Sequence, residues 1–320
     1  MFLHQPNTPV SVLKSSELLL PKDAVYLASS SIKGQVVLIL KRALADPTVK
    51  VELVGRGYVH WIEDIRAPCD YSRDGIIFNK ADYMHKTKTL PLEGNRLSAG
   101  SHTFEFHFKL PPRIPSTFES SVGRISYFVQ ASCRSPEYTL VRKKMYLMIQ
   151  GTSDFGRKKT LQNPLVAEAE KVCYNCLRRG TICLRFQVEK NTFTPGERVI
   201  FITEINNQTG KCIRTVTSAL CVHMRYEGFT RTGGQRSWLS SSELVQQKKV
   251  NIRVMPFSTT TFAGAFSLPH VLSVSINARD GEPVSFQYQL VGTIRVPWSL
   301  ASVRARLPIT ISSPPVDADT

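Results

Sequence analysis

The amino-acid sequence has no long hydrophobic run. Its longest strongly aliphatic stretch, Val36–Leu40, is far shorter than the roughly 18 residues that a membrane-spanning helix needs. The first residues, Met1–Pro6, lack the basic start and the following apolar stretch of a secretory signal. Of the 320 residues, 42% are hydrophobic and 21% are charged, a balance typical of globular proteins. We therefore expect a soluble intracellular protein, and the length favours two domains.

Sequence motifs of catalysis are also absent. The chain has no GxSxG nucleophile elbow, no phosphate-binding P-loop and no HExxH zinc motif. Residues Gly55–His60 begin like a dinucleotide-binding loop, but His60 stands in place of the third glycine. Glu105 and His107 would share one face of a strand, where a solvated surface explains them better than an acid–base pair. The sequence therefore predicts no enzymatic activity and no cofactor.

The seven cysteines cannot all form disulfides with one another, because their number is odd. Cys173 and Cys176 form a CxxC pair, and Cys183 follows it. A structural zinc site usually needs a second such pair or two histidines at suitable spacing, and the chain has neither. We favour small buried or linker thiols over zinc binding. Lipidation of Cys173 or Cys176, beside Arg178 and Arg179, is a further alternative.

Acidic residues are in the minority, since 41 lysines and arginines outnumber 25 aspartates and glutamates and give a net charge of +16. The excess is spread over both halves of the chain, so a nucleic-acid partner is not expected. The candidate residues for binding an anion or a phosphate group are Arg142, Lys143, Lys144, Arg157, Lys158 and Lys159. Such clusters attract phosphorylated peptides and acidic lipid headgroups. A basic surface that only keeps the protein soluble is the alternative.

A two-residue periodicity dominates the chain. Between residues 103 and 110, the apolar side chains Phe104, Phe106, Phe108 and Leu110 alternate with polar ones. Successive side chains of a strand point to opposite faces, so this pattern predicts a half-buried strand over a core. Similar runs recur along the chain, with turn signals between them. Only residues 165–177 favour a helix, and the remainder indicates antiparallel β-sandwiches.

The second half of the chain repeats landmarks of the first. Phe108–Pro111 matches Phe266–Pro269, and strands centred on Tyr127 and Tyr288 follow at nearly the same offset. Upstream, the stretch that begins at Tyr26 corresponds to the stretch that begins at Phe193. Three landmarks in the same order indicate two related sandwiches in tandem, joined near residues 151–180.

Four segments resemble the sequence motifs of one protein family. They are Leu97–Pro111, Pro115–Glu119 with Gly123 and Tyr127, Phe193–Glu197 and Ile205–Thr209. The first resembles the pattern L-x-x-G-x-x-x-F-x-F-x-F-x-L-P, and the last two are similar to Y-x-P-G-E and I-x-N-x-S/T. These patterns are those of the α-arrestin, or arrestin domain-containing, branch of the arrestin superfamily. The resemblance extends over about residues 12–312.

The resemblance implies an all-β fold of two tandem arrestin-type, immunoglobulin-like antiparallel β-sandwiches. The expected parts are an N-terminal sandwich at residues 1–150, a linker at 151–180, a C-terminal sandwich at 181–312 and a short tail at 313–320. It also implies a non-enzymatic adaptor or scaffold, without metal or cofactor, that binds cytoplasmic parts of membrane proteins during endocytosis, sorting and protein transport. Such a protein would be cytoplasmic and peripherally associated with plasma, endosomal or vesicle membranes. A structural bridge or coat component of an intracellular transport complex is the alternative.

The sequence departs from the family pattern at two places. Ala28-Ser29-Ser30 stands where a P-G-E-like turn is common, so we expect a turn of different shape. Many α-arrestins carry P-P-x-Y motifs that recruit ubiquitin ligases through WW domains. Here Asp317 follows Pro314-Pro315-Val316 in place of the tyrosine. The expected partners are therefore cytoplasmic tails of membrane proteins and acidic phospholipids, with ubiquitin-ligase machinery engaged only through another surface.

Overall fold

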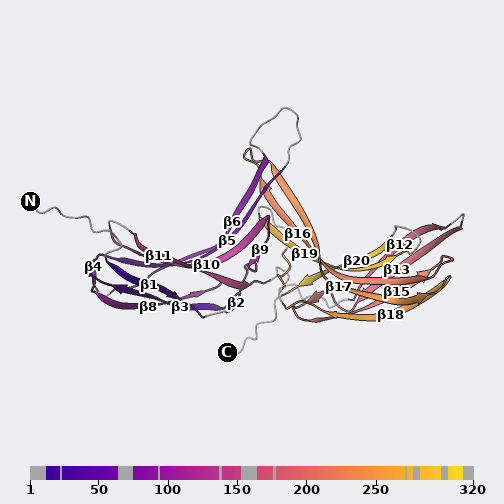
Figure 1. The fold of residues 1–320 in the computed structure, drawn as a ribbon, viewed down its shortest axis with the longest axis horizontal. Helices are drawn as coiled ribbons and strands as arrows, with labels where there is room; N and C mark the ends of the chain where they lie inside the picture. The colour runs from indigo at the N-terminus through magenta and orange to yellow at the C-terminus, as the bar shows by residue number, and fades with distance from the viewer. Residues whose placement is uncertain are drawn as a thin grey trace, which may run out of the picture. The chain divides into compact units, whose positions relative to one another are not determined.

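The computed structural model describes residues 12–21, 24–63, 75–92, 94–136, 139–152, 164–175, 178–270, 272–276, 282–296 and 302–312. Over these ranges the chain forms β-strands joined by turns and loops, with no α-helix. Accordingly, no helix in the described ranges is long and apolar enough to cross a membrane. The strands divide into two compact units (Figure 1). Unit 1 comprises Met1–Gly151, Gly228–Gln235 and Gly281–Pro283, and unit 2 comprises Thr152–Glu227, Arg236–Asp280 and Val284–Thr320.

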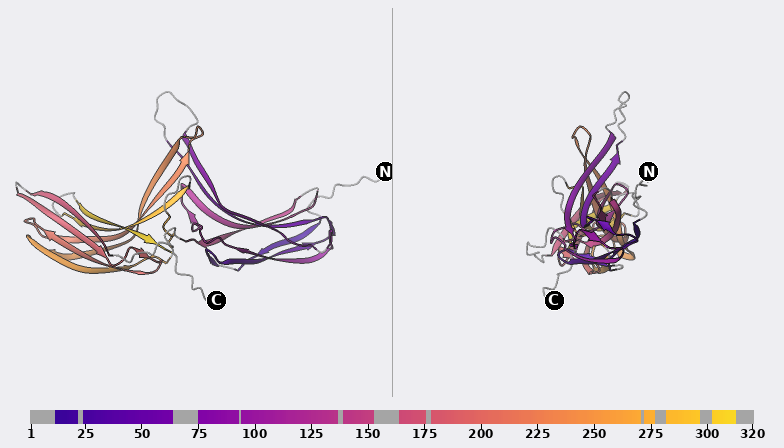
Figure 2. Two further views of the ribbon diagram at one scale, coloured as in Figure 1. Left: turned by 180° about the vertical axis from the view of Figure 1, so that it is seen from behind. Right: turned by 90° about the vertical axis from the view of Figure 1, so that its left-hand side faces the viewer.

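Unit 1 is a sandwich of two sheets. One sheet has the strand order β1-β3-β8, and the other has the order β6-β5-β10-β11-β2, with β9 beside β10. Figure 1 shows β1, β3 and β8 in one layer and β10 and β11 in the other, and Figure 2 shows the same strands from behind. Pairing is antiparallel except between β2 and β11, which run parallel. The bounds are β1 (Leu13–Leu19), β2 (Val25–Leu27), β3 (Ser31–Leu40), β4 (Leu44–Ala45), β5 (Thr48–Ile62), β6 (Ile76–Thr89), β7 (Arg96–Leu97), β8 (Gly100–Lys109), β9 (Phe118–Glu119), β10 (Gly123–Arg134) and β11 (Thr139–Gln150), where β4 pairs with β7.

The core of unit 1 lies between these sheets. Along β8, Phe106 and Phe108 are buried while their polar neighbours are exposed, which confirms the alternation read from the sequence. Tyr127 of β10 is completely buried, and its hydroxyl donates a hydrogen bond of 2.7 Å to the carbonyl of Pro115. Gly55 of β5 makes room for this ring, since a Cβ atom at Gly55 would come within 2.4 Å of it. Close packing around one tyrosine therefore joins β5, β10 and the segment before β9.

Unit 2 is a second sandwich with the same plan. One sheet has the order β12-β13-β15-β18, and the other has the order β14-β20-β19-β16, with β17 paired to β16. The buried rings of Phe186, Phe201 and Phe266 pack against one another in tilted pairs, with centroids 5.2 Å and 5.8 Å apart in the two successive pairs. The bounds are β12 (Leu165–Asn175), β13 (Arg178–Val188), β14 (Thr192–Phe193), β15 (Arg198–Asn207), β16 (Ile213–Phe229), β17 (Gln235–Val254), β18 (Ser258–Ser267), β19 (Val284–Arg295) and β20 (Ser302–Ile311). The two units together confirm the predicted all-β fold of tandem antiparallel sandwiches.

The repeat seen in the sequence extends to individual hydrogen bonds. Tyr288 of unit 2 donates from its hydroxyl to the carbonyl of Ser273 at 2.7 Å, as Tyr127 does to Pro115 in unit 1. Both tyrosines are buried, so each removes a loop carbonyl from water and satisfies it. The same hydrogen bond from a tyrosine to a loop carbonyl therefore anchors β10 in unit 1 and β19 in unit 2.

The turn at Ala28-Ser29-Ser30 has the same shape as its counterpart in unit 2, so the predicted difference is wrong. Ser29 has a φ of 69° and donates its N–H to the carbonyl of Pro111, while Gly196 has a φ of 81° and donates to Pro269. The two bonds measure 3.2 Å and 3.1 Å. A serine in this left-handed conformation is strained where glycine is not. Tertiary contacts hold Ser29 in this left-handed conformation, although serine is unfavourable there.

Residues 165–175 form strand β12, so the helix favoured by residues 165–177 is also wrong. Val166, Glu168 and Glu170 are exposed while the residues between them are half-buried, which is the two-residue period of an edge strand. β12 pairs antiparallel with β13 along its whole length. This pairing outweighs the helix propensity of alanine and glutamate, which is only a fraction of a kcal/mol per residue. The strand lies inside the range 151–180 that the sequence assigns to a linker.

Candidate anion-binding face

Arg142, Lys143 and Lys144 lie on β11 and are all exposed. In a strand, adjacent residues point to opposite faces. Arg142 and Lys144 therefore share the outer face of the sheet, while Lys143 lines a small crevice on the opposite side with Glu17 and Cys133. The other three candidates, Arg157, Lys158 and Lys159, lie outside the described residues. The structure thus brings together two of the six candidates on one face.

Lys144 is held against aromatic rings. Its ammonium group donates a hydrogen bond of 2.9 Å to the Tyr146 hydroxyl. The same nitrogen lies 3.7 Å from the centre of the Phe128 ring and 4.4 Å from that of Tyr146, within the range of cation–π attraction. The hydrogen bond from Lys144 lowers the pKa of the Tyr146 hydroxyl, and the charge of Arg124 acts in the same direction. We call Arg142, Lys144 and Tyr146 the β11 strip.

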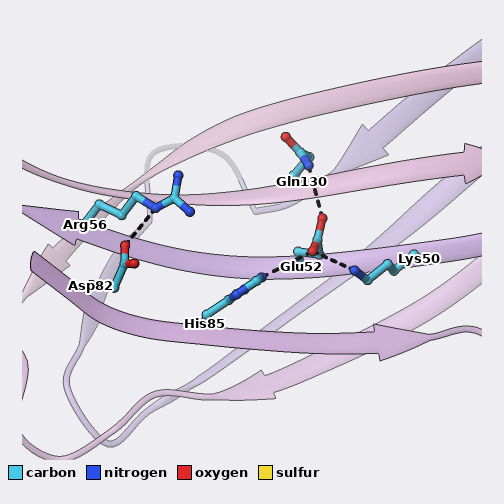
Figure 3. A network of polar contacts seen from close by, with 6 residues as sticks. All are labelled: Lys50, Glu52, Arg56, Asp82, His85 and Gln130. Carbon is cyan, nitrogen blue, oxygen red and sulfur yellow. Dashed lines mark hydrogen bonds and ion pairs between the residues drawn. The ribbon is translucent and has the colours of Figure 1, made fainter. Parts of the chain in front are cut away.

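Glu52 lies at the centre of a polar network on β5, β6 and β10 (Figure 3). Its carboxylate accepts hydrogen bonds from Lys50 at 2.8 Å and from Gln130 at 3.2 Å, and it lies 3.2 Å from Nε2 of His85. The bond from Lys50 is the largest influence on Glu52 and, with those from His85 and Gln130, lowers its pKa against the opposing effect of burial. Gln130 is opposite Lys144 in the β10–β11 register, so the network borders the β11 strip.

A second acidic residue of this face is also neutralised. Asp82 of β6 forms an ion pair with Arg56 at 2.9 Å, and Lys80 approaches it to 3.9 Å (Figure 3 shows the Arg56 bond). The two carboxylates of the network are therefore occupied by neighbouring cations. Arg142 forms no ion pair with any acidic residue in the described part of the chain. An incoming anion would meet its guanidinium without competition from a bound carboxylate.

A groove of about 380 Å³ lies beside the β11 strip. Tyr146 and Met148, which are 63% and 54% exposed, line it together with Phe118 and Arg124. The groove thus combines a cation with apolar and aromatic side chains, an arrangement that fits a peptide with an acidic group and an apolar anchor. The sequence analysis missed Arg124, Tyr146 and Met148. The two-residue period of β10 and β11 was the signal that could have placed them with Lys144.

The sequence of each unit matches a known domain. Residues 19–155 match the N-terminal domain of arrestin (or S-antigen), and residues 178–316 match its C-terminal domain. The chain belongs to the arrestin family. It is 59% identical over 317 residues to arrestin domain-containing protein 5 of Homo sapiens, covering 99% of this chain and 92% of that protein. The Bos taurus protein of the same name is 60% identical, with 97% and 94% covered.

A more distant relative also comes from the arrestin domain-containing branch of the family. Arrestin domain-containing protein 17 of Caenorhabditis elegans is 28% identical over 210 residues, covering 62% of this arrestin and 48% of that protein. The resemblance to the arrestin domain-containing proteins, read from motifs, is thereby confirmed. The motifs themselves are mostly architectural, since Phe106, Phe108 and Tyr127 of this arrestin lie in the core.

Among the described residues of this arrestin, the cysteines and the acid–base candidates do not gather into a site. Cys173 is buried and Cys183 half-buried, whereas Cys176 lies outside the described residues. No group of three metal-ligating side chains is found in the described ranges. Glu105 accepts a hydrogen bond of 3.2 Å from Gln35 on an exposed surface.

Proposed function

We propose that this protein is a non-enzymatic adaptor that binds cytoplasmic segments of membrane proteins during endocytosis, sorting and protein transport. Its place in the arrestin domain-containing family supports an adaptor role. The observation that carries the proposal is the β11 strip, where exposed cations lie beside an apolar groove. The protein would act in the cytoplasm, at the surface of plasma, endosomal or vesicle membranes.

The strip suits acidic or phosphorylated tails for a physical reason. The guanidinium of Arg142 can donate paired hydrogen bonds to a carboxylate or phosphate, and such charge-assisted bonds are the strong ones. Tyr146 and Met148 would cover an apolar side chain of the same tail. Because the cations are exposed, their attraction should weaken as salt rises. Acidic phospholipid headgroups near the cargo would add to this attraction.

Affinity purification from lightly cross-linked membranes, at low and high salt, tests the proposal. The adaptor should retain integral membrane proteins and transport factors that are released at high salt. Arg142→Gln combined with Lys144→Gln should reduce the recovered cargo about tenfold, since two charge-assisted contacts are lost. Lys41→Gln combined with Arg42→Gln is the matched control, because it removes the same charge from an exposed loop.

The decisive failure would be unchanged binding. If neutralising all six candidate residues leaves both cargo recovery and sedimentation with acidic vesicles unaltered, the basic surface plays no part. A small set of soluble partners at fixed ratio, retained at high salt, would instead favour a structural bridge in a transport complex. Ubiquitin ligases recovered with the chain would then have to bind a surface other than a P-P-x-Y motif.

A further inference from the structure

Strand β18 (Ser258–Ser267) is a sheet edge of unit 2 that carries no charged residue and no proline. It is the last strand of the sheet β12-β13-β15-β18, where β15 is its one neighbour among the described strands (Figure 1). Natural sheet edges are commonly protected from pairing with another chain by charged side chains. The other edge of this sheet, β12, carries Glu168, Glu170 and Lys171, and both edges of the β1-β3-β8 sheet are charged as well. β18 is ten residues long and lacks this protection.

The backbone groups at this edge belong to alternate residues of β18. At the end of the β15–β18 pairing, the N–H of Leu268 donates to the carbonyl of Glu197. The register is continuous from there along the whole of β15, and backbone groups of an antiparallel strand point alternately to its two sides. Even-numbered residues of β18 therefore direct their N–H and C=O groups toward β15, and odd-numbered residues direct theirs toward the edge. The odd-numbered residues are Thr259, Thr261, Ala263, Ala265 and Ser267.

The side chains along this edge leave room for a further strand. Most of the odd-numbered side chains are exposed, and none is larger than threonine. Two exposed isoleucines of β15 lie behind them, Ile202 opposite Ala263 and Ile200 opposite Ala265. On the inner face of β18, Phe262 is half-buried. Apolar surface therefore remains partly exposed on both faces beside the edge, and a strand added there would cover it.

We propose that two copies of this chain associate through β18, paired antiparallel about a two-fold axis at Ala263. The residue pairs across the axis are Ala263 with Ala263, Thr261 with Ala265, and Thr259 with Ser267. Every odd-numbered residue of one copy then meets an odd-numbered residue of the other, so the outward N–H and C=O groups of both edges pair. A register moved by two residues would set Thr259 against Pro269, which has no N–H to donate. The register centred on Ala263 is the one that pairs all the odd-numbered residues.

Charge favours a second copy at this edge. The net charge of +16 on each copy opposes association through a basic surface, and β18 is uncharged. The two charged residues of β15 are Glu204 and Arg198, and both lie on its outer face with Ile200 and Ile202. Across the joined sheet, they would lie in line with Ile200 and Asn206 of the second copy, so neither faces a like charge. Salt screens the remaining repulsion and should strengthen the dimer, whereas it weakens anion binding at the β11 strip. The proposal therefore does not depend on the function proposed for that strip.

Sedimentation velocity of the full chain, over a range of protein and salt concentrations, tests the association. The wild type should form a dimer whose fraction rises with both. Ala263→Lys sets two lysines against each other at the axis and should weaken the dimer at least about tenfold. Val166→Lys is the matched control, because it adds the same charge at an exposed position of β12, the opposite edge of the same sheet. This control should dimerise as the wild type does.

Cross-linking tests the register. The Cα atoms of a hydrogen-bonded antiparallel pair lie about 5.5 Å apart, which is within the range of a disulfide. Ala263→Cys should therefore give disulfide-linked dimers on oxidation with copper–phenanthroline. Thr259→Cys should not, because the pairing places the two copies of this residue at opposite ends of the joined strands. The unsubstituted chain, with its seven cysteines, shows how much cross-linking the native thiols give.

A chain that stays monomeric at every protein and salt concentration would overturn the proposal. A dimer that Ala263→Lys and Val166→Lys weaken equally would overturn it too, because the copies would then meet through another surface. Equal cross-linking of the two cysteine variants would contradict the axis at Ala263. A monomer that loses a soluble protein partner in Ala263→Lys, but not in Val166→Lys, would assign the edge to that partner instead of a second copy.

Discussion

Replacing Ser29 by glycine should stabilise unit 1. Its φ of 69° lies in the left-handed region, where a side chain costs about 1–2 kcal/mol. The side chain is exposed and makes no hydrogen bond in the described structure, so its removal breaks no contact. Glycine is more flexible than serine in the unfolded chain, and this reduces the gain in stability by about 0.5–1 kcal/mol. The expected net gain is therefore about 0.5–1 kcal/mol in the free energy of unfolding.

Two further substitutions make this a test of backbone conformation. Gly196→Ala changes the equivalent turn of unit 2 in the opposite sense, and a Cβ atom there would also come within 2.6 Å of the His270 ring. It should destabilise unit 2 by about 1–2 kcal/mol. Ser101→Gly makes the same chemical change as Ser29→Gly at an exposed position of β8, opposite Ile39 of β3. It should destabilise unit 1 by about 0.5–1 kcal/mol.

Each unit needs its own signal, because two units need not unfold together. Hydrogen–deuterium exchange at increasing urea concentrations, resolved to peptides of each unit, provides it. A gain of about 0.5–1 kcal/mol corresponds to roughly twofold to fivefold slower exchange in the core strands of unit 1. If Ser29→Gly is neutral or destabilising while Gly196→Ala is tolerated, the left-handed turn does not carry the strain assigned to it.

Two further predictions concern polar side chains of unit 1 and unit 2. Tyr127→Phe should destabilise unit 1 by about 1–2 kcal/mol, and Tyr288→Phe should destabilise unit 2 by the same amount, because the carbonyls of Pro115 and Ser273 lose their hydrogen-bond donors. Urea unfolding resolved to each unit measures both effects. An unchanged free energy of unfolding in either variant would contradict the prediction. Folding lowers the pKa of Glu52 below its ordinary value of 4.5. The charged carboxylate therefore stabilises unit 1 above pH 4.5, and this stabilisation is lost as the pH falls through the lowered pKa. Glu52→Gln should therefore flatten the acid side of the stability–pH curve, and an unchanged curve would refute the role of the network.

The sequence predicted the sandwiches well because their determinants are local. The alternation around Phe106 and the repeated tyrosines report which face of each strand is buried, whatever strand lies next to it. The helix expected at residues 165–177 failed for the converse reason. Alanine and glutamate favour a helix in isolation, but pairing with β13 decides the outcome, and that partner is not visible in a local window.

The candidate sites were harder to predict because neighbours across a sheet are distant in sequence. The basic run at 142–144 is divided by the strand, which sends Lys143 to one face and its two neighbours to the other. Conversely, Arg295 and Arg304 share a groove through the β19–β20 register, although each stands alone in the sequence. In a β-protein, a run of like charges is therefore a poorer indicator of a charged surface than residues spaced by two.

The parallel pairs β2–β11 and β14–β20 bear on how this protein can be dissected. Each joins an early strand of a unit to its last one, and Ala28 donates to the carbonyl of Gln150 while Ser312 donates to that of Phe193. Gly151 is held in turn by the hydroxyl of Ser116, at 2.9 Å. A fragment that stops before residue 148 would lose the three residues of β11 that pair with β2. Proteolysis or alternative splicing just upstream of that point would remove the β2–β11 pairing from unit 1, although most of the core residues of unit 1 would remain.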